Sequence, residues 1–98
     1  MNSLRGEKIS EELAELKEFS NELVLEMKLL NESRIYNELI NWNNTFFTTS
    51  SELLGEFRNI LIDVKKVKSL NRRCMKKTMK YLETIDVAFD NQKNENVI

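Results

Sequence analysis

Few residue types in this sequence could take part in catalysis. The chain contains no histidine and one cysteine, Cys74, among its 98 residues. Without histidine the common zinc sites and all histidine-based nucleophile activation are excluded, and a lone cysteine cannot form an internal disulfide. Acid pairs such as Glu11 and Glu15 could ligate a metal ion, but their pattern fits an ordinary exposed helix face. We therefore expect no cofactor, no metal site and no enzymatic activity.

A basic segment is the strongest local charge feature. Eight lysines and arginines lie between Val64 and Lys80 with no acidic residue among them. Such clusters are typical of nucleic-acid binding. Against this, the sequence pI is about 5.6, no aromatic residues alternate with the basic ones, and residues 1–50 carry five basic and nine acidic residues, a net charge of −4. We favour a solvated basic face that pairs with the acidic half of the chain.

Helices must position these residues. The chain has no proline and only two glycines, so it lacks the turn chemistry of β-proteins, and we predict an all-α fold. Apolar residues recur in steps of three and four, and N-terminal capping signals occur at Ser10 and at Thr49 with Glu52. These patterns predict a helix over about residues 10–40 with a bend near Asn31, a turn over 41–48, a helix over 49–90 and a flexible tail over 91–98.

Two such helices would form one antiparallel hairpin domain over residues 1–98. A turn centred near residue 45 would place Ser20 and Asn71, the polar interruptions of the two apolar seams, opposite each other. A buried polar pair of this kind can fix the register of two helices. The alternative is a real break at residues 31–33, which would create a third helix and a monomeric bundle.

Apolar residues off the two seams would remain uncovered on a two-helix hairpin. Such a stripe normally marks a partner surface, and pairing with a second copy or with another helical protein would complete a four-helix-type bundle. No apolar run exceeds three residues, so we expect neither membrane insertion nor a cleavable signal peptide. The residues that we predict to contact the partner are Phe19, Leu25, Leu29, Leu54, Leu61, Met75 and Met79.

The predicted turn contains the only tryptophan, Trp42. A lone tryptophan in the turn of a helical hairpin of this length resembles the WXG family of small type VII secretion proteins. In that family a Trp-x-Gly motif marks the turn, and Asn44 occupies the glycine position here. The family's export signal is Tyr-x-x-x-Asp/Glu. Leu82 and Asp86 have its spacing, whereas Tyr81 lies one residue too far from Asp86.

These departures make the chain more similar to the small helical accessory proteins that bind LXG toxins in Gram-positive type VII systems. The resemblance implies a cytoplasmic targeting factor or chaperone, with or without export, that binds the helical N-terminal domain of an LXG-type toxin. It also implies a turn motif and a composite export signal. The turn-motif residues are Trp42, Asn44, Phe46 and Phe47, and the export-signal candidates are Tyr81, Leu82, Asp86 and Phe89. We expect the three aromatic residues of the turn to fold back over the end of the hairpin.

Two other functions remain open at the level of the sequence. One is an immunity protein that neutralises a toxin in the same cell. The other is a small nucleic-acid-binding regulator that uses the basic residues 65–80.

Overall fold

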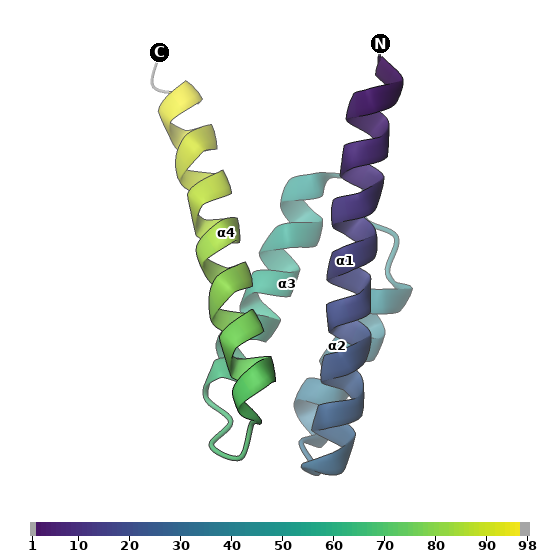
Figure 1. The fold of residues 1–98 in the computed structure, drawn as a ribbon, viewed down its shortest axis with the longest axis vertical. Helices are drawn as coiled ribbons and strands as arrows, with labels where there is room; N and C mark the ends of the chain where they lie inside the picture. Colours follow the sequence, from purple (N-terminus) through teal and green to yellow (C-terminus); the bar gives the residue numbers. More distant parts are fainter. Residues whose placement is uncertain (1, 97–98) are drawn as a thin grey trace. The chain divides into compact units, whose positions relative to one another are not determined.

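The computed structural model of this chain is all-α, which confirms the predicted fold class. It describes the backbone of residues 2–96 and the side chains of residues 13–90, and the described residues contain no strand. These described residues form four helices, α1 (Asn2–Leu29), α2 (Ser33–Asn44), α3 (Ser50–Lys65) and α4 (Arg72–Asn96) (Figure 1).

The helices form two compact units, Met1–Asn44 and Thr45–Ile98. In the first, which we call the N-terminal pair, α2 turns back along α1 (Figure 1). In the second, the C-terminal pair, α4 turns back along α3. The prediction of two long helices, the first of them bent near Asn31, is therefore wrong, because each of them is divided into a helical pair.

The first break lies at residues 30–32. Asn31 has a φ of 59°, in the left-handed region that asparagine tolerates better than most residues. The Glu32 amide donates to the Met27 carbonyl at 2.9 Å, and the Asn31 amide donates to the Lys28 carbonyl at 3.3 Å. These two bonds form a Schellman motif, which satisfies carbonyls left open at the end of α1. The break that the alternative placed at residues 31–33 is thus confirmed, whereas the monomeric bundle stays a prediction.

Substitution of Asn31 should change the free energy of unfolding in both directions. We expect Asn31→Gly to raise it by a few tenths of a kcal/mol, because glycine adopts this conformation without a Cβ penalty. Asn31→Val should lower it by about 1–2 kcal/mol, because a β-branched side chain is strained at positive φ. Urea denaturation followed by circular dichroism measures both, with exposed Asn37→Val as the control. Equal stability of the two Asn31 variants would contradict the assigned cap.

The second break, at residues 66–71, was not predicted. The Lys66 and Val67 amides donate to the carbonyls of Asp63 and Val64, each three residues earlier, which tightens the last turn of α3. Asn71 then caps α4: its Oδ1 accepts from the Cys74 amide at 2.8 Å. Asn71 is exposed, so the predicted buried pair of Ser20 with Asn71 is wrong. An asparagine before a helical segment is an N-cap signal, which the seam pattern concealed.

The other helix ends differ from prediction only in part. Thr49 caps α3 as predicted, its hydroxyl accepting from the Glu52 amide at 3.1 Å, whereas the Glu52 carboxylate accepts from the Thr48 hydroxyl. The predicted start at Ser10 is wrong because α1 begins at Asn2, and α4 continues to Asn96 beyond the predicted end at residue 90. The prediction for residues 97–98 lies outside the described residues.

The core residues recur at helical spacing within each pair. Trp42 and Leu39 are buried on α2, and Phe57 and Val64 are buried on α3. Apolar residues three or four apart lie on one helix face, so each helix buries a single stripe. Further buried apolar residues are Leu16, Phe19, Leu23, Met27 and Ile35 in the N-terminal pair, and Ile60, Leu61, Val67, Cys74, Leu82 and Ile85 in the C-terminal pair.

Candidate partner-binding surfaces

The predicted partner residues fall into three groups by exposure. Leu25 and Leu29 on α1 are 65% and 78% exposed, and Met79 on α4 is also exposed. Leu54 and Met75 are half-buried. Phe19 and Leu61 are buried, so the prediction that they lie on an open surface is wrong. They lie off the seams of two continuous helices, but the breaks redirect the helices and change which faces are covered.

Only part of the predicted turn motif lies outside a helix, since Phe46 and Phe47 lie in the connection between α2 and α3. Trp42 is buried within α2, and Asn44 is the exposed last residue of that helix. Phe47 is half-buried, whereas Phe46 is 92% exposed. Trp42 is therefore a core residue of the N-terminal pair, and the expectation that Phe46 folds back over the helix end is wrong.

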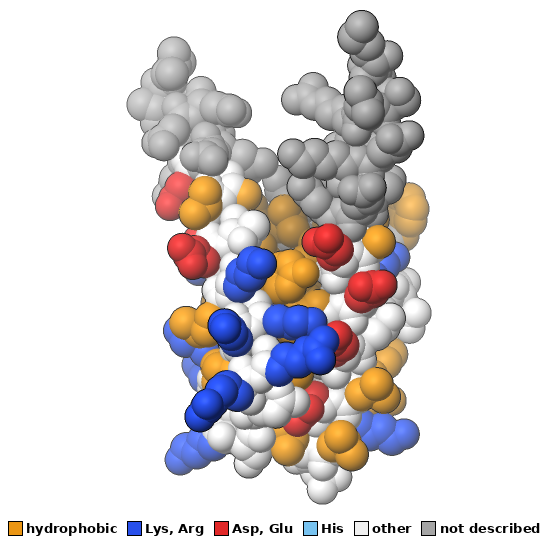
Figure 2. All heavy atoms as spheres, in the orientation of Figure 1, with side chains coloured by type: hydrophobic (Ala, Val, Ile, Leu, Met, Phe, Trp, Pro, Cys, Tyr) orange, Lys and Arg blue, Asp and Glu red, His pale blue; other side chains and the backbone are white. Residues whose placement is uncertain are grey.

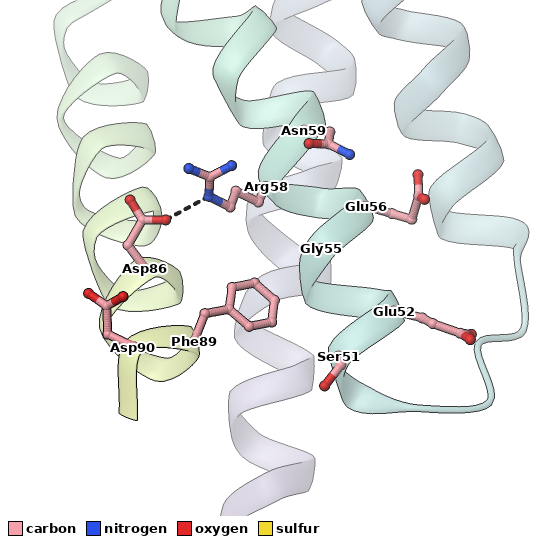
Figure 3. A pocket seen from close by; sticks show the side chains of 9 residues that line it. All are labelled: Ser51, Glu52, Gly55, Glu56, Arg58, Asn59, Asp86, Phe89 and Asp90. Atoms are coloured by element: carbon pink, nitrogen blue, oxygen red, sulfur yellow. Dashed lines mark hydrogen bonds and ion pairs between the residues drawn. The ribbon is translucent and has the colours of Figure 1, made fainter. Parts of the chain in front are cut away.

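The export-signal candidates lie on α4 in different environments. Leu82 is buried and Tyr81 is half-buried. Asp86 is exposed, and one of its carboxylate oxygens accepts from Arg58 Nε on α3 at 2.6 Å. Figure 3 shows this pair beside Phe89, which reaches from α4 toward Gly55 on α3. A Cβ added at Gly55 would lie 4.0 Å from the Phe89 ring, so the glycine leaves room for this aromatic side chain.

A groove runs along the surface between α3 and α4, and we call it the α3–α4 groove. Its basic end is lined by lysines from the end of α3 and the first turns of α4. Figure 2 shows basic side chains gathered over the lower part of α4. Farther along lie apolar side chains, followed by carboxylates near the Arg58–Asp86 pair. The lysines are Lys65, Lys66, Lys76 and Lys80, the apolar residues Ile62, Met79, Leu82 and Val87, and the acids Glu83, Asp86 and Asp90.

Sequence reasoning missed Val87, which is 53% exposed in this groove. It also missed Arg58, which binds Asp86 from the neighbouring helix. The position of Val87 seven residues after Lys80 could have placed both on one face of a helix. No local signal relates Arg58 to Asp86, because only the return of α4 along α3 brings them together.

Two buried hydroxyls have no hydrogen-bond partner among the described residues. They belong to Ser20 on α1 and Thr78 on α4, and both side chains are fully buried. A buried polar group without a partner destabilises the fold, because it has lost its hydrogen bonds to water. Neither hydroxyl lines the α3–α4 groove.

Replacing Thr78 by valine should raise the free energy of unfolding by about 1–2 kcal/mol. Valine has nearly the same shape and removes the unpaired hydroxyl, so the cost of burying that polar group disappears. Urea denaturation measures the change. Thr84→Val is the matched control, because the exposed Thr84 hydroxyl already donates to the Lys80 carbonyl and should show no comparable gain. A loss of stability at Thr78→Val would mean that the hydroxyl is hydrogen-bonded in solution.

The described residues show no arrangement typical of a metal centre. Among these residues, no three cysteine, aspartate or glutamate side chains form a group that could hold an ion. Cys74 is buried on α4 and is not part of a disulfide. In the same part of the chain, no helix is long and apolar enough to cross a membrane. The exposed apolar side chains and the α3–α4 groove are thus the candidate functional features.

Comparison with protein-family models, curated proteins and solved structures found no match to this chain.

Proposed function

We propose that this chain is a non-enzymatic helical partner protein. It binds the helical N-terminal domain of a larger protein, an LXG-type toxin of a type VII secretion system, and serves as its targeting factor or chaperone. The observation that supports partner binding is the exposure of Leu25 and Leu29 on adjacent turns of α1. Large apolar side chains grouped on the surface of a small protein are typical of an interaction site. The toxin and the secretion system are proposed from the sequence resemblance.

Partner binding through α1 can be tested by co-expression. The chain, carrying an affinity tag, is produced together with the helical N-terminal domain of an LXG protein encoded beside it, and the mass of the purified complex is measured. We expect a stable complex that is lost in Leu25→Glu/Leu29→Glu, because two carboxylates would have to be buried without partners. Lys17→Glu is the control, since Lys17 is exposed on α1 away from the leucine face.

The outcomes of this experiment separate the proposed function from its rivals. If the chain ignores the helical domain and instead captures the toxin's catalytic or pore-forming domain, it is an immunity protein. If wild type and the double leucine variant capture the helical domain equally well, the α1 surface is not the binding site. If no complex forms with any part of the toxin, the proposed function is wrong.

The export role requires a test that leaves the core intact. Leu82→Ala would remove a buried side chain and lower stability as well as the signal, so Asp86→Asn is the better variant. We expect it to abolish export, scored as protein in the culture medium, while binding to the toxin domain is retained. Arg58→Gln is the control, because it removes the ion pair with Asp86 but keeps the carboxylate. Export of Asp86→Asn at the wild-type level would contradict the signal.

A second candidate, a nucleic-acid-binding regulator, is favoured by the break at residues 66–71. The break brings exposed basic side chains from the end of α3, the connecting loop and the start of α4 to one end of the C-terminal pair. This candidate predicts binding to duplex DNA that weakens steeply as salt concentration rises. Absence of binding at low salt excludes it.

A further inference from the structure

We propose that the α3–α4 groove binds an amphipathic helix of another protein, in which acidic residues surround one apolar anchor and basic residues surround a second anchor about two turns away. All the residues that line the groove belong to the C-terminal pair. The inference adds a second binding surface to the proposed function, and it rests on that function only in taking the occupant to be a segment of another protein.

The charge of the groove changes sign along its length. On α4 the last groove lysine, Lys80, is followed three residues later by Glu83, and the charged α4 residues that line the groove beyond it are Asp86 and Asp90. We call the part with the four lysines the basic half and the part from Glu83 onward, with Arg58 of α3, the acidic half. Four lysines give the basic half a charge of +4, whereas three carboxylates and one guanidinium give the acidic half −2.

These charges are available to a partner. The four groove lysines, Glu83 and Asp90 are exposed, and none of them forms an ion pair with another residue in the described part of the chain. Asp86 is already paired with Arg58 at 2.6 Å. The groove therefore offers unpaired positive charge in one half and unpaired negative charge in the other.

Each half also contains one exposed apolar side chain. Met79 is 44% exposed and lies beside Lys80 in the basic half, and Val87 is 53% exposed and lies between Glu83 and Asp90 in the acidic half. The two are eight residues apart on α4, which is about 12 Å along a helix. A helix bound in a groove places anchors at i and i+7, about the same distance apart. An amphipathic helix thus matches both the apolar spacing and the change of charge.

The same charge order disfavours a polyanion along the groove. A nucleic acid presents negative charge over its whole length, so any part of it that extended beyond Lys80 would face Glu83 and Asp90. An anionic membrane would meet the same two carboxylates. Neither would cover Met79 and Val87 while also satisfying the acidic half, because that half requires positive charge. A protein segment can carry all three kinds of side chain.

Two synthetic helical peptides test the proposal, each of about 18 residues, a length of about five turns. Both carry leucine anchors on one face. The acidic–basic peptide has glutamates around its first anchor and lysines around its second, and the all-basic peptide has lysines around both. Each is labelled with a fluorophore and titrated with the purified full-length chain, and anisotropy measures the Kd. We expect the chain to bind the acidic–basic peptide at least tenfold more tightly, because the all-basic peptide meets like charge in the basic half.

Charge reversal within the groove should remove this preference. We expect Lys76→Glu/Lys80→Glu to weaken binding of the acidic–basic peptide at least tenfold, because its glutamates would then face carboxylates. Lys68→Glu/Arg72→Glu is the matched control, since it changes the net charge equally at exposed residues of the same basic segment that do not line the groove. It should keep the wild-type preference. Circular dichroism checks that both variants retain the wild-type helical content.

Several results would overturn the proposal. One is no saturable binding of the acidic–basic peptide up to about 100 µM, which corresponds to a binding free energy weaker than about 6 kcal/mol. Another is an equal loss in the control variant, which would place the charges that matter outside the groove. A third is binding of a short DNA duplex, abolished by Lys76→Glu/Lys80→Glu, in place of the peptide. The last is a dimer of the chain alone, seen by sedimentation velocity and dissociated by Met79→Glu, because a second copy would then occupy the groove.

The peptide titration and the toxin-domain capture fail independently. If the acidic–basic peptide does not bind but the chain still captures the toxin domain through α1, only this inference is wrong. If the peptide binds with the expected preference but no toxin domain is captured, only the proposed function is wrong.

Discussion

Replacing Phe57 by alanine should lower the free energy of unfolding by about 3–5 kcal/mol. Phe57 lies on α3 and its side chain is 0% exposed, so truncation removes the full transfer free energy of an aromatic side chain and leaves a cavity. Since small domains are stable by only about 5–15 kcal/mol, this loss is a large part of the total. Urea denaturation followed by circular dichroism measures it, with Phe57→Leu as a milder variant if Phe57→Ala does not fold.

Phe46 provides a control with the same chemical change. Its side chain is 92% exposed, so Phe46→Ala should change stability by less than about 0.5 kcal/mol. The comparison also tests a prediction from the sequence, in which Phe46 packs over the end of a hairpin. A large loss at Phe46→Ala would show that this aromatic side chain is covered in solution and that its exposed position is incorrect.

The second large effect is expected at Trp42. Trp42→Ala should lower the free energy of unfolding by about 3–5 kcal/mol, because Trp42 is buried in the N-terminal pair. It is the only tryptophan, so wild-type fluorescence reports its environment directly. We expect blue-shifted emission in the folded protein and a red shift on unfolding. Circular dichroism must follow the alanine variant, which has lost this probe.

Asn44→Ala is the control for Trp42. In the resemblance to the WXG family, Trp42 and Asn44 belong to one turn motif and should be comparably important. In the structure Trp42 is buried, whereas Asn44 is an exposed helix end, so Asn44→Ala should be nearly neutral. Similar losses at both positions would favour the turn motif over the core assignment.

The α-helical character of the chain could be predicted from residue types and periodicity. Proline is absent, glycine is rare, and apolar residues recur every three or four positions. These properties favour a helix locally, over one or two helical turns, whatever the tertiary structure. The cap at Thr49 followed from local chemistry for the same reason. The break near Asn31 was visible as an alternative, because asparagine tolerates positive φ.

The second break was not predicted because Asn71 was interpreted only as a polar position of the second apolar seam. Its spacing fitted an apolar seam that ran through residues 49–90, and the seam pattern concealed the capping signal. In the structure the cap prevails: the Asn71 side chain accepts from the Cys74 amide, and α4 begins immediately after it. A capping hydrogen bond stabilises a helix start by about 1 kcal/mol. A polar side chain buried on the seam would instead need a partner at the same level.

Some properties of the candidate surfaces could likewise be predicted from the sequence, whereas others depend on the tertiary structure. By itself the sequence determined the residue types available: apolar side chains in excess of one seam, a basic segment over residues 65–80, and no histidine. It could not decide which apolar residues stay exposed, because a heptad pattern describes one face of a straight helix and both breaks change helix direction. Only the tertiary structure buried Phe19 and Leu61, left Leu25 and Leu29 open, and joined Arg58 to Asp86 across two helices. Burial and ion pairing depend on contacts between residues that are brought together when the chain reverses direction. These contacts cannot be inferred from the separation of the residues in the sequence.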